Sequence, residues 1–237
     1  MQVSRNPGRW AGLLYLVASV PAVFALIYVP GKLIVHGNAP ATIHNIAASE
    51  PLFRAAIAAE LIGQGLFVFV ALALYELFKG VDQRRAAQML LLILISIPIA
   101  FLNELNSLAT LELVRGDDFL SALDKPQRDA LAMLFVRLHG DGFDIASIFW
   151  GLWLFPLGAL AYQSRFIPRI IGVLLIAHGC TYVIGSLVSF VLPQYEKPVS
   201  QWMMPFTFGE PLFMLWLLVM GAIPKPSARP AQGAGVG

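Results

Sequence analysis

The sequence predicts an all-α fold, a six-helix transmembrane bundle with an amphipathic helix in the third inter-helix loop, on the outer side. Two observations carry this prediction. Of the 237 residues, 58% are hydrophobic and only 13% are charged, whereas a soluble domain has about a quarter of its residues charged. In addition, six apolar stretches reach the length of about 20 residues that a spanning helix needs. The expected spans are residues 10–30, 52–78, 86–111, 139–163, 167–192 and 202–223.

The first apolar stretch is interpreted as a retained helix and not as a signal peptide. Arg5 and Arg9 precede it, as the charged start of a signal peptide would. The apolar core of a signal peptide is about 7–15 residues long and ends at a small-residue cleavage site. This run is longer and no Ala-x-Ala site closes it, so we expect it to remain in the protein.

The loop between the third and fourth spans, residues 112–138, contains the predicted amphipathic helix. Asp124 suits an N-cap, with Pro126 in the first turn. Apolar residues then recur at i, i+3, i+4 and i+7, and we expect the helix on the outer surface of the membrane or bundle. Gly140 and Gly142 predict a bend into the fourth span. The apolar positions are Leu131, Leu134, Phe135 and Leu138.

Basic residues in alternate short loops predict the orientation, because cytoplasmic loops are rich in Lys and Arg. The even number of spans returns the C-terminus to the side of the N-terminus, so both termini are expected in the cytoplasm. We expect one transmembrane domain, residues 1–223, and a disordered cytoplasmic tail, residues 224–237, which is rich in Pro, Ala and Gly. The basic residues are Arg5, Arg9, Lys79, Arg84, Arg85, Arg165, Arg169, Lys225 and Arg229.

Four segments resemble a bacterial membrane family known only as a domain of unknown function, number four-three-eight-six. They are Asn103-Glu-Leu-Asn-Ser-Leu, Leu138-His-Gly-Asp-Gly, Ile148-Phe-Trp-Gly-Leu-Trp-Leu-Phe-Pro-Leu-Gly and Ser164-Arg-Phe-Ile-Pro-Arg-Ile-Ile-Gly-Val-Leu-Leu-Ile. The resemblance covers nearly the whole chain and implies a multi-pass protein of the bacterial inner (cytoplasmic) membrane. It supplies no activity, cofactor or catalytic residue.

Polar and ionisable residues inside the expected spans are the candidate functional residues, since such groups are costly in a bilayer unless they face an interior. Four helices place a carboxylate about 8–12 Å from their outer ends, at 1.5 Å rise per residue. We therefore predict that polar helix faces converge on a cavity open to the outside. The candidate lining residues are Glu60, Asn103, Glu104, His139, Asp144, His178 and Glu210.

The buried acids have no evident cationic partner, because no Lys or Arg lies deep in any expected span. They are expected to be protonated, solvated by water or bound to a cation. Structural interpretations remain open beside the functional one. Glu60 and Asp144 can reach toward the outer interface, and Glu104 can join an interhelical hydrogen-bond network. Glu210 lies between Pro205 and Pro211, where a broken helix favours a site.

Three functions fit these observations, and the sequence does not decide whether the protein is an enzyme or which cofactor, if any, it uses. We favour binding or transport of a small solute or cation in the outward cavity. The second possibility is a metal-assisted intramembrane hydrolase acting on a lipid-like substrate, with Glu104, His139 and Glu210 as candidate metal ligands. The third is a structural or sensory membrane protein. The expected partner is the lipid bilayer and not nucleic acid, for which a net charge of +2 gives no support.

Overall fold

The computed structural model describes residues 6–222, and these form helices and connecting turns without a strand. Six helical segments in this part are long and apolar enough to cross a membrane, which confirms the predicted fold class. The predicted disordered tail, residues 224–237, lies outside the described residues. The first span combines α1 (Pro7–Val23), a π-helical turn η1 (Phe24–Tyr28) and α2 (Val29–Leu33). The next four are α4 (Glu50–Phe78), α5 (Gln83–Arg115), α6 (Lys125–Ser164) and α7 (Arg169–Val191).

The sixth span is broken into several short helices, as the prolines around Glu210 predicted. It consists of η3 (Pro193–Tyr195), α8 (Glu196–Met203), a 3-10 stretch η4 (Met204–Phe208) and α9 (Gly209–Val219). Pro205 lies inside the 3-10 stretch, and a proline both removes a backbone donor and crowds the preceding turn. Two further short helices, α3 (Ala39–Ala48) and η2 (Asp118–Leu120), lie in the loops.

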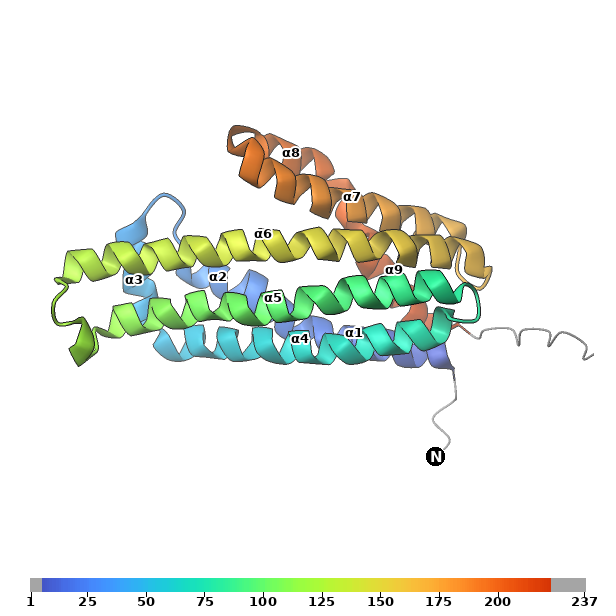
Figure 1. Cartoon of the computed structure of the whole chain (residues 1–237), viewed down its shortest axis with the longest axis horizontal. Coiled ribbons are helices and arrows are strands. Elements are labelled where there is room, and N and C mark those ends of the chain that lie inside the picture. The colour runs from blue at the N-terminus through green and yellow to red at the C-terminus, as the bar shows by residue number, and fades with distance from the viewer. Residues whose placement is uncertain (1–5, 223–237) are drawn as a thin grey trace, which may run out of the picture.

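The predicted amphipathic segment is helical, but it is the direct extension of the fourth span. Asp124 caps α6 as predicted, in a capping box with Gln127. The helix then runs 40 residues without interruption, so the bend predicted at Gly140 and Gly142 does not occur. Glycine permits a bend but does not impose one, because the helical hydrogen bonds continue through it. Figure 1 shows α6 alongside α5 over most of their length.

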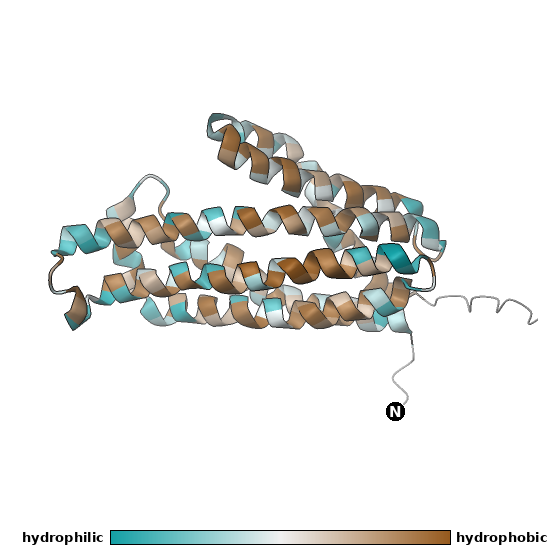
Figure 2. Ribbon diagram, in the orientation of Figure 1, coloured by the Kyte–Doolittle hydropathy of each residue, from teal (hydrophilic) through white to brown (hydrophobic). Residues whose placement is uncertain are grey.

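The six spans form a closed ring of neighbours. Contacts join α1 to α4, α4 to α5, α5 to α6, α6 to α7, α7 to α9 and α9 back to α1. Apolar residues dominate the middle of the helices and polar residues gather near their ends (Figure 2). A bilayer offers no hydrogen-bond partner to the backbone, so only helices satisfy it there.

The two ends of the described chain meet at one end of the bundle, which we call the terminal end. The side chain of Asn6 accepts hydrogen bonds from the backbone of Gly8 and Arg9, and so caps α1. The same oxygen accepts from the backbone N–H of Ala222 at 2.9 Å, and the N–H of Gly8 donates to the carbonyl of Ala222 at 3.0 Å. Asn6 therefore ties the start of the first span to the end of the sixth.

The terminal half of the bundle is filled by a continuous apolar core. Large side chains from neighbouring helices are fully buried there, including two stacked phenylalanines of α4 and α9, Phe78 and Phe213, whose ring centroids lie 6.4 Å apart. Trp153, Leu157 and Leu217 belong to the same cluster. The polar residues and the cavities described below begin at the edge of this core and extend into the opposite half, which we call the far half.

Glycines set the distance between α6 and α7. A Cβ on Gly158 would lie 2.6 Å from the carbonyl oxygen of Gly172, and one on Gly151 would lie 2.6 Å from that of Gly179. The two pairs stand two helical turns apart. Small residues let membrane helices approach until their backbones touch, which maximises van der Waals contact where the hydrophobic effect does not act between helices.

This packing predicts opposite effects for two Gly→Ala substitutions in the same helix. Gly158→Ala should lower the free energy of unfolding by about 1–3 kcal/mol, because the methyl group collides with the α7 backbone. Gly140→Ala, where an added Cβ has no neighbour within 4 Å, should raise it by about 0.4–1 kcal/mol by restricting the unfolded chain. Unfolding titrations in mixed micelles measure both, and equal effects of the two substitutions would contradict the packing described here.

Candidate binding cavity and buried acids

A cavity of about 710 Å³ occupies the bundle between α1, α4, α6, α7 and the broken sixth span. Its wall is rich in aromatic rings and contains two acids, Glu60 and Glu210, and the imidazole of His178. No Lys or Arg is among the described residues that line it. The aromatic lining residues are Tyr15, Phe67, Trp150, Trp153 and Tyr182.

The cavity exists because the sixth span leaves the bundle on the far side. Helix α8 packs on α7 and on its chain neighbours, and it makes no substantial contact with α1 or α4. In Figure 1, α8 and the adjoining half of α7 diverge from α6. Helix α9 then returns to the bundle at Gly209, where a Cβ would lie 2.4 Å from the carbonyl oxygen of Leu174 on α7. The break therefore opens the far half while α9 stays packed in the terminal half.

Glu210 is the centre of one polar cluster in this cavity. The hydroxyl of Tyr15 on α1 donates a hydrogen bond to its carboxylate. The backbone N–H of Glu210 donates to Nδ1 of His178 at 3.3 Å. Because Nδ1 accepts this bond, we place the imidazole proton on Nε2, and the 3.6 Å approach of Nδ1 to the Glu210 carboxylate is not an ion pair. His178 also stacks on Tyr182, with ring centroids 4.8 Å apart.

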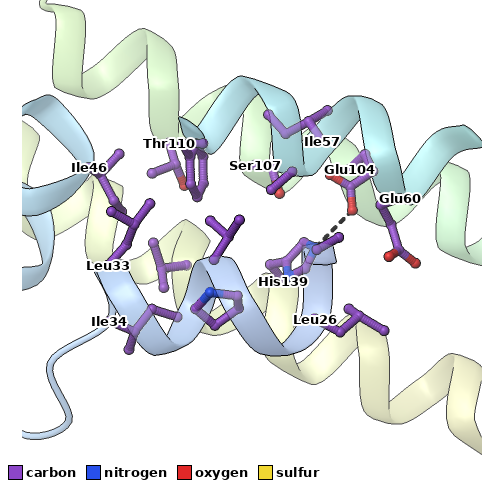
Figure 3. Close-up of a pocket in the computed structure, with 16 residues that line it drawn as sticks. Leu26, Leu33, Ile34, Ile46, Ile57, Glu60, Glu104, Ser107, Thr110 and His139 are labelled. Atoms are coloured by element: carbon purple, nitrogen blue, oxygen red, sulfur yellow. Dashed lines mark hydrogen bonds and ion pairs between the residues drawn. The ribbon is translucent and has the colours of Figure 1, made fainter. Parts of the chain in front are cut away.

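A second polar cluster joins α5 to α6. Nε2 of His139 lies 2.9 Å from Oε1 of Glu104, and Figure 3 shows this pair facing each other. The side chain of Asn103 donates to the backbone carbonyl of His139 at 2.9 Å and accepts from Asn106 at 3.0 Å. A Cβ on Gly142 would lie 2.0 Å from the Asn103 side chain, so the glycine that predicted a bend instead makes room for this amide.

The second cluster borders a smaller cavity of about 80 Å³ between the first span, α3, α4, α5 and α6. Most of its wall is aliphatic, with Glu60, Glu104, Ser107, Thr110 and His139 as the polar lining residues. Such a volume holds a few waters and no larger solute. This smaller space thus brings Glu60 next to the Glu104–His139 pair, as Figure 3 shows.

Glu60 stands at the junction of the two clusters. It lines the cavity of about 710 Å³, the one of about 80 Å³ and a gap of about 10 Å³ between them. Gln64, one turn along α4, donates to its Oε1 at 2.9 Å. Its Oε2 is buried and has no hydrogen-bond partner among the described residues. A buried oxygen of this kind is costly unless something else pairs with it.

The candidate residues named from the sequence therefore fall into three groups. Glu60, His178 and Glu210 line the large cavity, while Asn103, Glu104 and His139 form the cluster between α5 and α6. Asp144 lines none of the three cavities and accepts a hydrogen bond from Ser189 of α7 at 2.5 Å.

The candidate metal ligands are divided between the two clusters. Glu104 and His139 are paired with each other, whereas Glu210 lies with Tyr15 and His178. In the part of the chain that the structure describes, no group of three or more His, Cys, Asp or Glu side chains is arranged to hold a metal.

Sequence reasoning missed two features of the site. Tyr15 gave no signal, because a single tyrosine in an apolar run is ordinary. The π-helical turn Phe24–Tyr28 was also missed, although Leu26 within it lines all three cavities. Prolines bracket the turn, Pro21 before it and Pro30 after it. Such π-turns are frequent at functional sites, and the proline pair was the available signal.

The fold and cavities define a multi-pass α-helical membrane protein with buried acids around an internal chamber. The chain belongs to the family described as Domain of unknown function (DUF4386), whose model matches residues 10–221. An uncharacterized protein of Archaeoglobus fulgidus is 35% identical over 78 residues, which cover 33% of this chain and 45% of the relative. The chain thus matches less than half the length of that relative. No solved structure matches the chain.

The Glu104–His139 contact predicts energetic coupling between the two residues. His139→Ala should lower the free energy of unfolding by about 1–3 kcal/mol, because it leaves the buried carboxylate of Glu104 unpaired. Glu104→Ala should cost less, because the His139 side chain that it leaves behind is 27% exposed. The double variant should cost less than the sum, with a coupling energy of about 0.5–3 kcal/mol. A control cycle with Glu104→Ala and Asp144→Ala, whose side chains share no hydrogen-bond partner, should be additive. Additivity in both cycles would mean that the Glu104–His139 interaction contributes nothing to the free energy of unfolding.

Proposed function

We propose that the protein binds a small, largely apolar solute in the large cavity and serves in its transport or sequestration. The observation that carries this proposal is the cavity itself. Its volume of about 710 Å³ lies within the range of about 300–1,000 Å³ typical of ligand pockets. Aromatic walls with a few converging polar groups are also what such pockets have in common.

The proposed setting is the cytoplasmic membrane of a bacterium, with both termini in the cytoplasm. Arg9, Lys79, Arg85 and Arg165 lie at or beside helix ends at the terminal end of the bundle. An excess of Lys and Arg in short loops favours the cytoplasmic side. In this orientation the far half, with the cavity, lies in the outer leaflet.

The proposed entry lies between the first span and α8. Val23 and Ile27 line the cavity from one side, and Ser200 and Met203 line it from the other. Val23 and Ile27 are also more than half exposed, at 54% and 67%. Because the side chains that flank the opening carry no charge, a solute dissolved in the bilayer can enter without crossing a charged surface.

The intramembrane metal hydrolase receives less support from the geometry. Its candidate ligands Glu104 and His139 stand in one cluster and Glu210 in another. A zinc site needs three or four protein ligands around one point. A purely structural role explains the two acids that pair across helices, Glu104 and Glu210. It does not explain Glu60, which is bonded only to Gln64 of its own helix.

Filling the cavity tests the proposal. Gly185 lines it from α7, and a Cβ there meets no atom within 4 Å, so Gly185→Trp should fill space without displacing the backbone. We expect neutral benzophenone, photoactivated with the full chain in lipid nanodiscs, to label peptides that contain Met203 and Met214. Gly185→Trp should reduce that labelling severalfold, as measured by mass spectrometry.

Gly65→Trp is the matched control, because an added Cβ at Gly65 also has no neighbour within 4 Å and the residue does not line the cavity. Labelling in this variant should equal that of the unmodified protein. If benzophenone labels only lipid-facing residues, or labels the cavity equally in both variants, the cavity does not bind solute.

A further inference from the structure

We propose that the solute of the large cavity is a lipophilic organic cation whose charged group is received by the carboxylate of Glu60. This inference rests on the proposed function and names the chemical class of its ligand. It is carried by three features: an unpaired oxygen of Glu60, the absence of a competing cation among the described lining residues, and the aromatic rings that line the same cavity.

The first feature is the unpaired oxygen. Glu60 is only 6% exposed, and Gln64 donates a hydrogen bond of 2.9 Å to its Oε1. That bond orients the carboxyl group and leaves Oε2 without a partner among the described residues. In the same membrane region, Glu104 has His139 and Glu210 has Tyr15. Among these three acids, Glu60 is the one with an oxygen that is both buried and without a hydrogen-bond partner in the described part of the chain, so this oxygen gains most from a ligand that pairs with it.

The second feature is the charge of the surroundings. The described residues that line the three cavities include no Lys or Arg. Both histidines nearby are engaged, His139 with Glu104 and His178 with Glu210. A ligand with a positive charge therefore meets no repelling group in the chamber, whereas an anion would face two acids.

The third feature is the set of aromatic rings. Trp150 lines two of the three spaces that Glu60 lines, the large cavity and the gap of about 10 Å³. Phe67 stands two turns from Glu60 on α4 and lines the same cavity. The ring of Phe67 makes edge contacts with Tyr15 and Trp153, at distances of 5.2 and 5.6 Å between ring centroids. Aromatic faces attract cations, and this attraction is stronger in a desolvated site.

These features favour an organic cation over a metal ion. Hard metal ions such as Ca²⁺ and Mg²⁺ require about six or more oxygen ligands at short range. Glu60 offers one unpaired oxygen, and the aromatic rings that line the cavity offer no strong ligand. An ammonium or phosphonium group needs only the opposite charge and a soft surface, and the remaining volume accommodates its apolar substituents.

The test uses tetraphenylphosphonium and its anionic counterpart of the same shape, tetraphenylborate, with the full chain in lipid nanodiscs. We expect tetraphenylphosphonium to bind and to compete with benzophenone labelling, and tetraphenylborate to do neither. Glu60→Gln should weaken tetraphenylphosphonium binding by about tenfold, equivalent to 1.4 kcal/mol, in equilibrium dialysis. Glu60→Asp keeps the charge and should retain most of the affinity.

Glu76→Gln is the matched control, since Glu76 lies on the same helix, forms an exposed contact with Lys79 and lines none of the cavities. It should leave binding unchanged. Equal binding of the two tetraphenyl ions, or equal affinity in Glu60→Gln and Glu76→Gln, would overturn the proposal. If benzophenone still labels the cavity in that case, the chamber binds solutes and only the assigned class is wrong. If benzophenone labelling also fails, the proposed function falls with it.

Discussion

The close contact between α6 and α7 is the constraint on which the rest of the structure depends. At Gly151–Gly179 and Gly158–Gly172 the backbones touch, which fixes α7 in depth and rotation. This placement presents His178 to the first turn of α9, where the backbone of Glu210 donates to it. Because α9 is seated in this way, Glu210 reaches Tyr15 of α1. These two glycine contacts therefore position α7, and through it α9, in a polar cluster to which α1 adds Tyr15.

Two of the buried acids also link neighbouring helices. A carboxylate in the middle of a spanning helix costs several kcal/mol unless it is paired or solvated. Glu104 is paired across α5 and α6, and Glu210 is paired across α1 and α9, so each acid also adds a link between helices. Glu60 is bonded only within its own helix, to Gln64, and forms no such link. Glu104 and Glu210 therefore join helices, whereas Glu60 borders the cavities and links its helix to no other.

Much of the fold could be predicted from the sequence because the bilayer imposes simple rules. The length of the apolar runs predicted six spans, and Asp124 with Pro126 predicted the start of α6. The prolines near Glu210 predicted a broken helix, which the 3-10 stretch confirms. The sequence could not predict how the polar residues would pair, because pairing depends on the rotation of each helix about its axis.

The rotation of a helix is set by its packing against other helices, and at several positions the neighbouring sequence gives no indication of that packing. Tyr15 is one tyrosine among apolar neighbours, yet it holds Glu210. Gly142 predicted a bend because glycine is common at helix ends, and the helix instead continues while Asn103 occupies the space over it. Candidate metal ligands at similar depth on different helices proved to face different partners.

The contact of Asn6 with the end of the sixth span has a consequence for biogenesis. The helices from α4 to α7 each pack on the next helix along the chain, so they can pair in the order in which the ribosome delivers them. The first span also packs on the next span, α4, but its second neighbour is α9, the last of the described helices. Until then the glycine-bearing face of α1, with Gly8 and Gly12, has no partner. The ring therefore closes only once α9 has been made, and until then the first span lacks its contact with the sixth.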